Sequence, residues 1–164
     1  MKKIVVINGT GGCGKDTFVE LCKKHTSVFN FSSIDKVKEV AKIIGWSGSK
    51  SEKDRKFLAD LKRLTTDYND MAFNSIIDGV NGFNNSEDEI MFIHIREPEE
   101  IKRVVEKFGA KSLLIKRIGQ DIIKSNTSDA NVENYNYDYI IENTTLDEYE
   151  NKAINFIKEL KNDK

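Results

Sequence analysis

A run of glycines followed by a lysine, near the start of the chain, has the composition of a phosphate-binding site. The run is Gly9-Thr10-Gly11-Gly12-Cys13-Gly14-Lys15, and its first glycine, last glycine and lysine have the spacing of a Walker A motif. Glycine lets the backbone curl around a phosphate with its N–H groups pointing inward, and no side chain blocks the approach. Lys15 adds a cation for the β- and γ-phosphates. We therefore expect residues 9–15, the glycine-rich loop, to bind ATP.

The two residues that follow this lysine are candidate ligands of Mg²⁺. Asp16 occupies the position at which a serine or threonine usually ligates magnesium, and Thr17 comes next. A carboxylate is a hard oxygen ligand, so Asp16 is able to hold Mg²⁺ directly or through water. The alternative is that both residues only stabilise the start of the helix that follows the loop.

The glycine-rich loop lies between an apolar segment and an amphipathic one, as the motif requires. Ile4-Val5-Val6-Ile7 is short and β-branched, which predicts a buried parallel strand. A helix is expected from Lys15 to about His25, with apolar positions at Phe18, Val19, Leu21 and Cys22. The N-terminus of that helix would add partial positive charge beside the loop.

The rest of the chain alternates between predicted strands and predicted helices. Further strands are expected at residues 28–31, 89–95, 112–116 and 139–141. Further helices are expected at about 34–44, 52–68, 69–80, 98–108 and 147–160. Ser32 or Ser33 is expected to cap the helix that starts near 34, and Asn81–Asp88 is expected to form turns. The alternation predicts a three-layer α/β fold of the P-loop NTPase type, with a five-stranded, mainly parallel sheet in one domain.

The composition of the chain argues against several classes of binding partner. A net charge of −1 over 164 residues argues against an electrostatic nucleic-acid binder. No apolar run is long enough to cross a bilayer, and the N-terminus has no signal-peptide pattern. The two cysteines, Cys13 and Cys22, do not suggest a disulfide framework. We expect a cytoplasmic protein whose partner is a small molecule.

Two regions have the positions that a kinase needs for its acceptor and for excluding water. A helical insertion at about 50–81 lies between the second and third strands, and a polar loop at about 118–136, a short lid, follows the fourth strand. Ligands of parallel sheets bind at the carboxyl ends of strands, where Arg96, Arg117 and Asn143 lie. These features favour a small kinase. The chain has no Asn-Lys-x-Asp guanine motif after a strand, which argues against a GTPase switch.

Several short segments are similar to those of a known family. Gly14-Lys15-Asp16-Thr17 is similar to its GKDT loop, and the other similar segments are 35–41 with Gly45-Trp46, 55–61, 95–101 and 137–143. On these segments the chain resembles the phage and bacterial deoxynucleoside monophosphate kinases, and the last segment is shared with dephospho-coenzyme A kinases. The resemblance spans nearly the whole chain. It implies ATP-dependent phosphoryl transfer to a nucleoside monophosphate, in particular a deoxynucleotide.

The resemblance also implies roles for individual residues. It puts Asp35 and Lys38 at the entrance to the acceptor site, and it lets Arg117 reach the transferring phosphoryl group from the lid. It likens Asn143-Thr144 to a segment whose backbone contacts adenine. For Asp35 and Lys38 the alternative is a solvated helix face, and for Arg117 it is a surface charge.

Two arginines and the lysine are candidates on chemical grounds. Lys15 would neutralise charge that builds between the phosphates during transfer. Arg96, at a strand end, would bind the acceptor, and Arg55 would hold the acceptor's phosphate by a bidentate pair. The alternative for Arg55 is an exposed helical arginine.

His94 departs from the family, which usually has an acid two residues before the arginine. A neutral histidine does not replace a carboxylate in holding hydrated Mg²⁺, so either Asp16 carries more of that role or metal dependence is altered. Two other functions stay open: a kinase for another small acceptor, such as dephospho-coenzyme A or a nucleoside, and a nucleotide-binding sensor without transferase activity.

Overall fold

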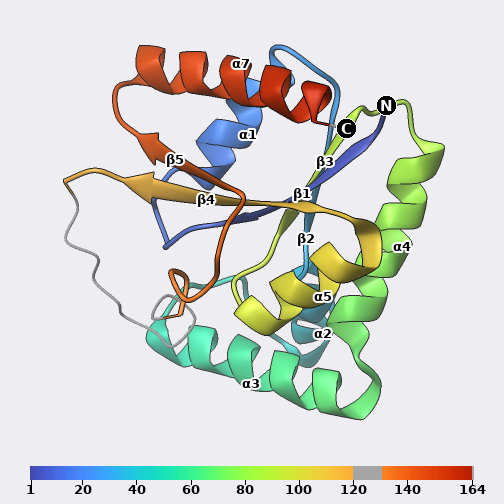
Figure 1. Ribbon diagram of the computed structural model, residues 1–164. Coiled ribbons are helices and arrows are strands. Elements are labelled where there is room, and N and C mark those ends of the chain that lie inside the picture. Colours follow the sequence, from blue (N-terminus) through green and yellow to red (C-terminus); the bar gives the residue numbers. More distant parts are fainter. Residues whose placement is uncertain (120–130, 164) are drawn as a thin grey trace.

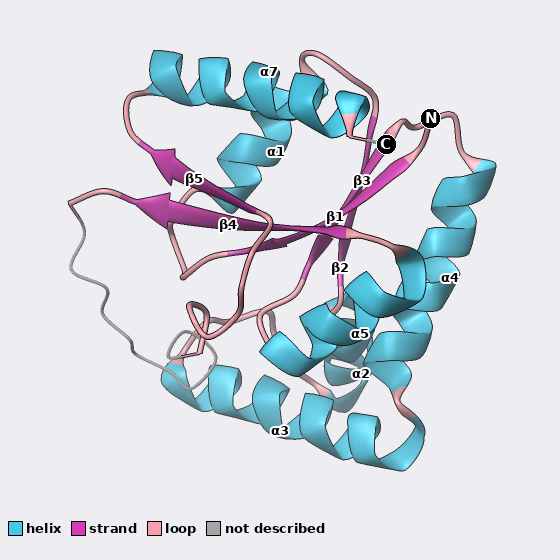
Figure 2. Ribbon diagram, in the orientation of Figure 1, coloured by secondary structure: helices cyan, strands magenta, loops and turns pink. Residues whose placement is uncertain are grey.

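A five-stranded parallel sheet lies at the centre of the protein in a computed structural model, which describes residues 1–119 and 131–163 (Figures 1 and 2). The strand order is β2-β3-β1-β4-β5. The strands are β1 (Lys3–Asn8), β2 (Val28–Ser32), β3 (Ile90–His94), β4 (Lys111–Arg117) and β5 (Tyr139–Asn143). All four pairings are parallel, so the carboxyl ends of the strands share one edge of the sheet. The predicted fold class is confirmed.

Side chains alternate between the two faces of the sheet, so each face carries apolar residues, and helices cover both faces. On one face, α1 (Lys15–Lys23) and α7 (Leu146–Asn162) pack on a core that includes Val5 and Ile7. On the other face, α4 (Met71–Asn85) and α5 (Pro98–Phe108) pack on a core that includes Val6. The mostly apolar β1, between β3 and β4, is therefore covered on both sides.

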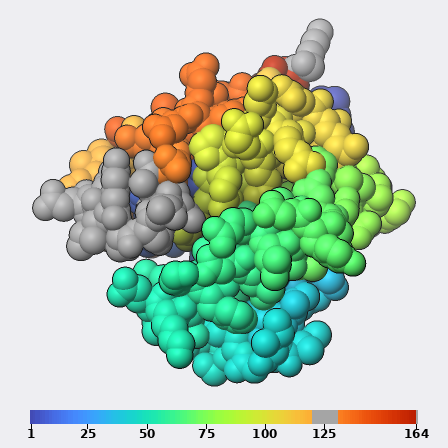
Figure 3. Space-filling view, turned by 90° about the horizontal axis from the view of Figure 1, so that it is seen from below, coloured from blue at the N-terminus to red at the C-terminus, as the bar shows by residue number. Residues whose placement is uncertain are grey.

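Two helices form a separate lobe. The helices α2 (Asp35–Ile44) and α3 (Glu52–Asn69) share a small core of their own, built on Val37, Ala41 and Leu61. Figure 3 shows this cyan and teal lobe below α5, which is yellow. The insertion expected at 50–81 thus divides in two: α3 belongs to the lobe, whereas α4 packs against the sheet and also contacts α2 and α3.

Most predicted helix ends are confirmed, but the expected cap of α2 is wrong. Gly45 ends α2 with a φ of 113°, and the hydroxyl of Ser51 caps α3 by accepting from the N–H of Asp54. Neither Ser32 nor Ser33 caps α2: Ile34 is the capping residue, with no side-chain hydrogen bond. The reason is that Ser33 is buried and its N–H donates to the carbonyl of His94, which extends the pairing of β2 with β3.

The segment expected to form turns at 81–88 is mostly helical. The helix α4 continues to Asn85 because Phe83, which is fully buried, prolongs the apolar face that Ile76 and Val80 begin. Its ring packs against Phe29 of β2 with a centroid separation of 6.0 Å. Within residues 1–119 and 131–163, no helix has the length and apolarity needed to span a membrane.

Candidate functional site

The glycine-rich loop joins the end of β1 to the start of α1, at the carboxyl edge of the sheet. A Cβ on Gly9 would lie 2.5 Å from Sγ of Cys13 and 2.7 Å from the carbonyl oxygen of Ile115. Gly14 has a φ of +101°, and a Cβ there would lie 2.3 Å from Nδ2 of Asn143. Close packing therefore requires glycine at both ends of the loop.

Lys15 folds back over the loop that precedes it. Its Nζ donates to the carbonyl oxygen of Gly9 at 2.6 Å and to that of Thr10 at 3.2 Å, and it lies 3.9 Å from Sγ of Cys13. These contacts hold the ammonium group within the curve of the loop. A phosphate on the loop's N–H groups would thus meet a cation already in place.

A cavity of about 380 Å³ opens beside this lysine. Most of the residues predicted to bind the nucleotide and metal line it, together with Arg117, which was predicted to reach the transferring phosphoryl group. The lining residues are Gly12, Gly14, Lys15, Asp16, Thr17, Arg117 and Asn143. Gly9, Gly11, Cys13 and Thr144 do not line this cavity. The guanidinium of Arg117 reaches over the loop and donates to the carbonyl oxygen of Gly12 at 3.4 Å. Cations and hydrogen-bonding groups thus gather from β4, β5, the loop and α1.

The C-terminal part of the chain supports the loop from behind. Asn143, at the end of β5, donates from Nδ2 to the carbonyl oxygen of Cys13 at 3.0 Å. Tyr149, on α7, donates from its hydroxyl to the carbonyl oxygen of Gly14 at 2.9 Å. Tyr149 is 1% exposed, and burial raises the pKa of its phenol well above the usual range, so it stays a donor. The sequence indicated only an apolar helix position at Tyr149, and no motif marks it as part of the site.

Asn8 is a second supporting residue that the sequence analysis missed. It ends β1, is fully buried, and accepts from the N–H of Gly9 through Oδ1 at 2.8 Å. Its Nδ2 donates to the carbonyl oxygen of Arg96 at 3.2 Å and to the hydroxyl of Tyr137 at 2.8 Å. A polar residue that closes an otherwise apolar strand, directly before the loop, is a signal that could have found it.

The predicted acceptor residues do not line the cavity. Asp35 and Lys38 are on α2, Arg55 is on α3, and Arg96 lies between β3 and α5. Asp35 and Arg55 are exposed, whereas Lys38 and Arg96 are half-buried. None of the four lines the 380 Å³ cavity. The donor-side residues thus converge at the cavity, whereas the acceptor-side residues lie outside its lining, although the charge of Arg96 is close enough to act on the ionisation of both Cys13 and His94.

His94 stands at the carboxyl end of β3, beside Ile7 of β1. Its Nε2 lies 2.9 Å from Oδ1 of Asn30, on β2. Burial lowers the pKa of the imidazole and outweighs the carboxylates of Asp16 and Asp35, which act in the opposite direction. His94 is therefore a neutral hydrogen-bonding group at neutral pH, and the acidic charges that act on it come from α1 and α2.

The donor set suits a magnesium–nucleotide complex better than a metal ion held by protein alone. In the described part of the chain, no three His, Cys, Asp or Glu side chains are grouped to hold a metal. Asp16 and Thr17 are exposed and line the cavity beside Lys15. Mg²⁺ usually keeps several waters and takes one or two protein oxygens plus substrate phosphates, so these two side chains fit it.

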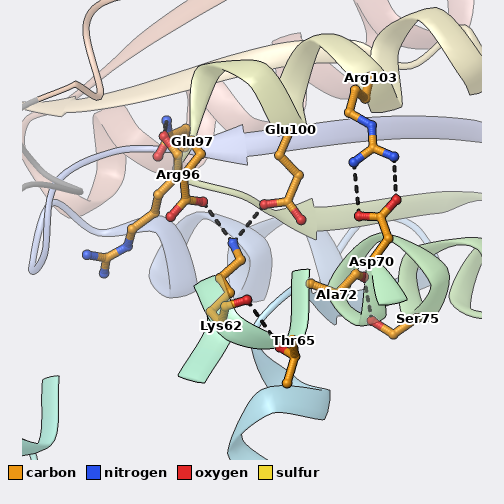
Figure 4. Close-up of polar contacts among 10 residues, drawn as sticks. Lys62, Thr65, Asp70, Ala72, Ser75, Arg96, Glu97, Glu100 and Arg103 are labelled. Carbon is orange, nitrogen blue, oxygen red and sulfur yellow. Dashed lines mark hydrogen bonds and ion pairs between the residues drawn. The ribbon is translucent and has the colours of Figure 1, made fainter. Parts of the chain in front are cut away.

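A buried lysine ties the lobe to the segment that follows Arg96. Nζ of Lys62, on α3, lies 2.9 Å from Oε2 of Glu97 and 2.8 Å from Oε2 of Glu100 (Figure 4). Burial opposes the charged form of this lysine, whose side chain is 15% exposed, but the two carboxylates prevail and raise its pKa. Figure 4 shows the Arg96 side chain extending away from this cluster. Lys62 thus holds the side chain of Glu97, the residue after Arg96, and not Arg96 itself.

A second ion pair fixes the far end of α3. Arg103, on α5, binds both carboxylate oxygens of Asp70, at 3.1 and 2.5 Å, and its guanidinium lies 3.8 Å from the centre of the Phe73 ring. Together with Lys62, this pair connects the lobe to α5 at two points. Of the lid expected at 118–136, residues 120–130 lie outside the described residues.

Comparison with known proteins gives similarity of fold. No protein-family model matches the sequence, and no curated protein matches it. The TT1252 protein of Thermus thermophilus superposes with a TM-score of 0.57 at 16% identity, covering 96% of both chains. A sugar kinase of Janibacter sp. HTCC2649 gives 0.56 at 12% identity, over 96% of this chain and 95% of its own. The shikimate kinase of Aquifex aeolicus gives 0.50 at 11% identity, over 94% and 96%. The α/β architecture is therefore shared with kinases.

Proposed function

We propose that this protein is a kinase that transfers a phosphoryl group from ATP to a small acceptor. The observation that carries the proposal is the 380 Å³ cavity, where the glycine-rich loop, Lys15, Asp16 and Arg117 converge. A fold shared with a sugar kinase and a shikimate kinase supports it at this general level.

The residues of the loop would act mainly by binding and orienting the donor. Backbone N–H groups at the start of α1 and the Lys15 ammonium would neutralise the phosphates as negative charge develops. Asp16 and Thr17 would hold Mg²⁺, which supplies further charge neutralisation between the phosphates. Arg117, whose guanidinium already reaches Gly12, would contact the bound nucleotide. Phosphoryl transfer needs positioning and charge neutralisation rather than a protein nucleophile, so this set is sufficient on the donor side.

For the acceptor we propose a nucleoside monophosphate, in particular a deoxynucleotide. The family resemblance supports it, and so does the cationic character of Lys38, Arg55 and Arg96, because an anionic acceptor needs positive charge as it approaches ATP. In this proposal the lobe formed by α2 and α3 takes the acceptor. The alternative is an uncharged hydroxyl acceptor, and the sugar kinase with the same fold favours it.

A panel of acceptors tests the proposal. The purified protein is incubated with ATP, Mg²⁺ and each common ribo- or deoxynucleoside monophosphate, or with sugars and shikimate. ADP release is followed and the product is identified by mass, with Lys15→Ala as the control. We expect a nucleoside diphosphate from at least one monophosphate, and none with the variant. A phosphorylated sugar would favour the hydroxyl acceptor. Tight ATP binding with no product from any acceptor would overturn the proposal that the protein is a kinase.

A further inference from the structure

The amide of Asn8 connects three segments that are far apart in the sequence. Its Oδ1 accepts from the N–H of Gly9, the first residue of the glycine-rich loop, and its Nδ2 donates to the carbonyl oxygen of Arg96. The same Nδ2 donates to the hydroxyl of Tyr137, which in turn donates to the carbonyl oxygen of Val132 at 2.6 Å. The side chain of Asn8 therefore connects the glycine-rich loop, the backbone of Arg96 and the 131–138 segment.

Only an amide satisfies these partners. The N–H of Gly9 requires an acceptor, while the carbonyl of Arg96 and the hydroxyl of Tyr137, already donating to Val132, require two donors. Asparagine supplies one acceptor and two donors at the reach of a short side chain. Burial raises the pKa of Tyr137 to about 12, so its hydroxyl keeps the proton it donates. Because Asn8 is fully buried, losing any of these bonds would leave a polar group without its partner.

The network begins where the sheet ends. On the β3 side of β1, the last backbone hydrogen bond is donated by the N–H of Ile95, just after β3, to the carbonyl of Ile7 at 3.3 Å. One residue further along each segment, the Asn8 side chain takes over and holds Arg96. On the other side of Arg96, the carboxylate of Glu97 is held by Lys62. Arg96 is thus held through its own carbonyl, and its neighbour Glu97 is held through its carboxylate. The side chain of Arg96 is half-buried and points away from Lys62.

We propose that Asn8 is a positioning residue that sets the place of Arg96 relative to the glycine-rich loop, and that Tyr137 holds Asn8 in the required orientation. The inference rests on the proposed function, because Arg96 and the loop would bind the two substrates of one transfer. Asn8 itself touches neither substrate. Its effect should appear in transfer and not in ATP affinity.

Three variants test the inference. Asn8→Asp keeps the shape but replaces both donors, and Tyr137→Phe removes one hydroxyl and keeps the ring. Tyr135→Phe is the matched control, since its ring packs on Tyr137 at 5.1 Å but its hydroxyl is outside this network. We expect Asn8→Asp and Tyr137→Phe to lower kcat for the acceptor by roughly ten-fold or more, with ATP affinity within about three-fold of wild type. Tyr135→Phe should match the wild type. Parallel losses of kcat and ATP affinity, or equal effects of the two tyrosine variants, would overturn the positioning role.

A second measurement needs no activity. Hydrogen exchange of the ligand-free protein should be faster at the amides of residues 95–97 and 131–133 in Tyr137→Phe than in Tyr135→Phe, while α7 is unchanged. Unchanged exchange at 95–97 would refute the link through Asn8 even if the protein is a kinase. Conversely, a wild type that phosphorylates no acceptor would refute the proposed function, and the exchange result would still decide whether Tyr137 and Asn8 hold the Arg96 segment.

Discussion

The hydroxyl of Tyr149 donates a 2.9 Å hydrogen bond to the carbonyl oxygen of Gly14, the residue immediately before α1. Tyr149 lies 135 residues further along the chain, on α7, with its ring against Phe18 at a centroid separation of 5.4 Å. The last helix is therefore part of the support for the glycine-rich loop, in addition to covering one face of the sheet.

Replacing Tyr149 with phenylalanine should weaken the loop without disturbing the core. Tyr149→Phe keeps the ring and leaves the Gly14 carbonyl without this donor, which we expect to cost about 1–2 kcal/mol of unfolding free energy. ATP affinity should fall a few-fold in calorimetry, because the end of the loop is less well held. Tyr139→Phe is the control: its ring also packs on α7, through Phe156 at 5.1 Å, but it lies away from the loop. Equal ATP affinity in Tyr149→Phe and the wild type would contradict a role for this bond in the site.

The sequence predicted that the glycine-rich loop, Lys15, Asp16 and Thr17 would lie together, because that information is local. The strand, the loop and the helix at residues 3–23 are contiguous, and each has its own pattern: β-branched residues, glycine spacing and apolar periodicity. Asp16 and Thr17 lie beside Lys15 in the chain and also beside it in the cavity. The alternation of strands and helices was sufficient to predict the parallel sheet for the same reason.

The supporting roles of Tyr149 and Tyr137 could not be predicted, because their partners are distant in sequence or hidden by the local pattern. Tyr149 satisfies an apolar helix pattern whether or not its hydroxyl binds Gly14, and Tyr137 was noticed only as part of a strand segment. Ser33 is a residue type that often caps helices, but here its N–H donates to the carbonyl of His94 and extends the sheet. Helix α4 continues through polar residues that were expected to form turns, because Phe83 is buried against Phe29 of β2, and this tertiary contact is not visible in the local sequence.

Two glycines of the loop should respond differently to alanine. Both have positive φ, 75° at Gly12 and 101° at Gly14, so each substitution carries backbone strain of roughly 1–2 kcal/mol. A Cβ on Gly12 meets nothing within 4 Å, whereas one on Gly14 meets Nδ2 of Asn143 at 2.3 Å. Gly14→Ala should therefore lower the unfolding free energy more than Gly12→Ala does, as measured in urea. Adding Asn143→Ala to Gly14→Ala should recover part of the difference. The same loss in both single variants would show that the contact with Asn143 is relieved at no cost.

The ion pairs of Lys62 should matter more for stability than those of exposed lysines on the same helix. Lys62→Met leaves Glu97 and Glu100 close together without their cation, which we expect to cost about 2–4 kcal/mol near neutral pH. Lys56→Met is the control, because Lys56 is 77% exposed and pairs with Asp60 at the surface, where little change is expected. The cost of Lys62→Met should shrink as the pH falls and the two carboxylates take up protons. A cost that stays constant down to pH 4 would mean that the lysine acts by packing and not by charge.

His94 should make the protein less stable in mild acid. Its pKa is lowered in the folded state, because burial outweighs the nearby carboxylates, so the unfolded chain binds a proton first as the pH falls. The stability from this residue is complete above its unfolded pKa of about 6.5 and is lost as the pH falls through the folded pKa. For one proton the slope is at most about 1.4 kcal/mol per pH unit. Denaturant titrations between pH 7.5 and 5 should show a smaller decline in His94→Gln than in the wild type. His25→Gln, at an exposed histidine, is the control, and identical declines in wild type and His94→Gln would contradict the prediction.

Asp16 should determine how the proposed kinase uses magnesium. Asp16 is an exposed carboxylate that lines the cavity beside Lys15, and His94 stands where the kinases that the sequence resembles usually have a second acid. We therefore expect Asp16 to carry most of the protein's contribution to the metal. Asp16→Ala should raise the Mg²⁺ concentration that gives half-maximal activity by roughly ten-fold, since one hard oxygen ligand is lost. Asp16→Ser restores the hydroxyl usual at this position and should recover much of the wild-type dependence. Asp35→Ala, which removes a carboxylate outside the cavity, should leave the magnesium dependence unchanged. If the magnesium dependence of Asp16→Ala equals that of the wild type while that of Asp35→Ala is shifted, the metal is held from α2 and not from the start of α1.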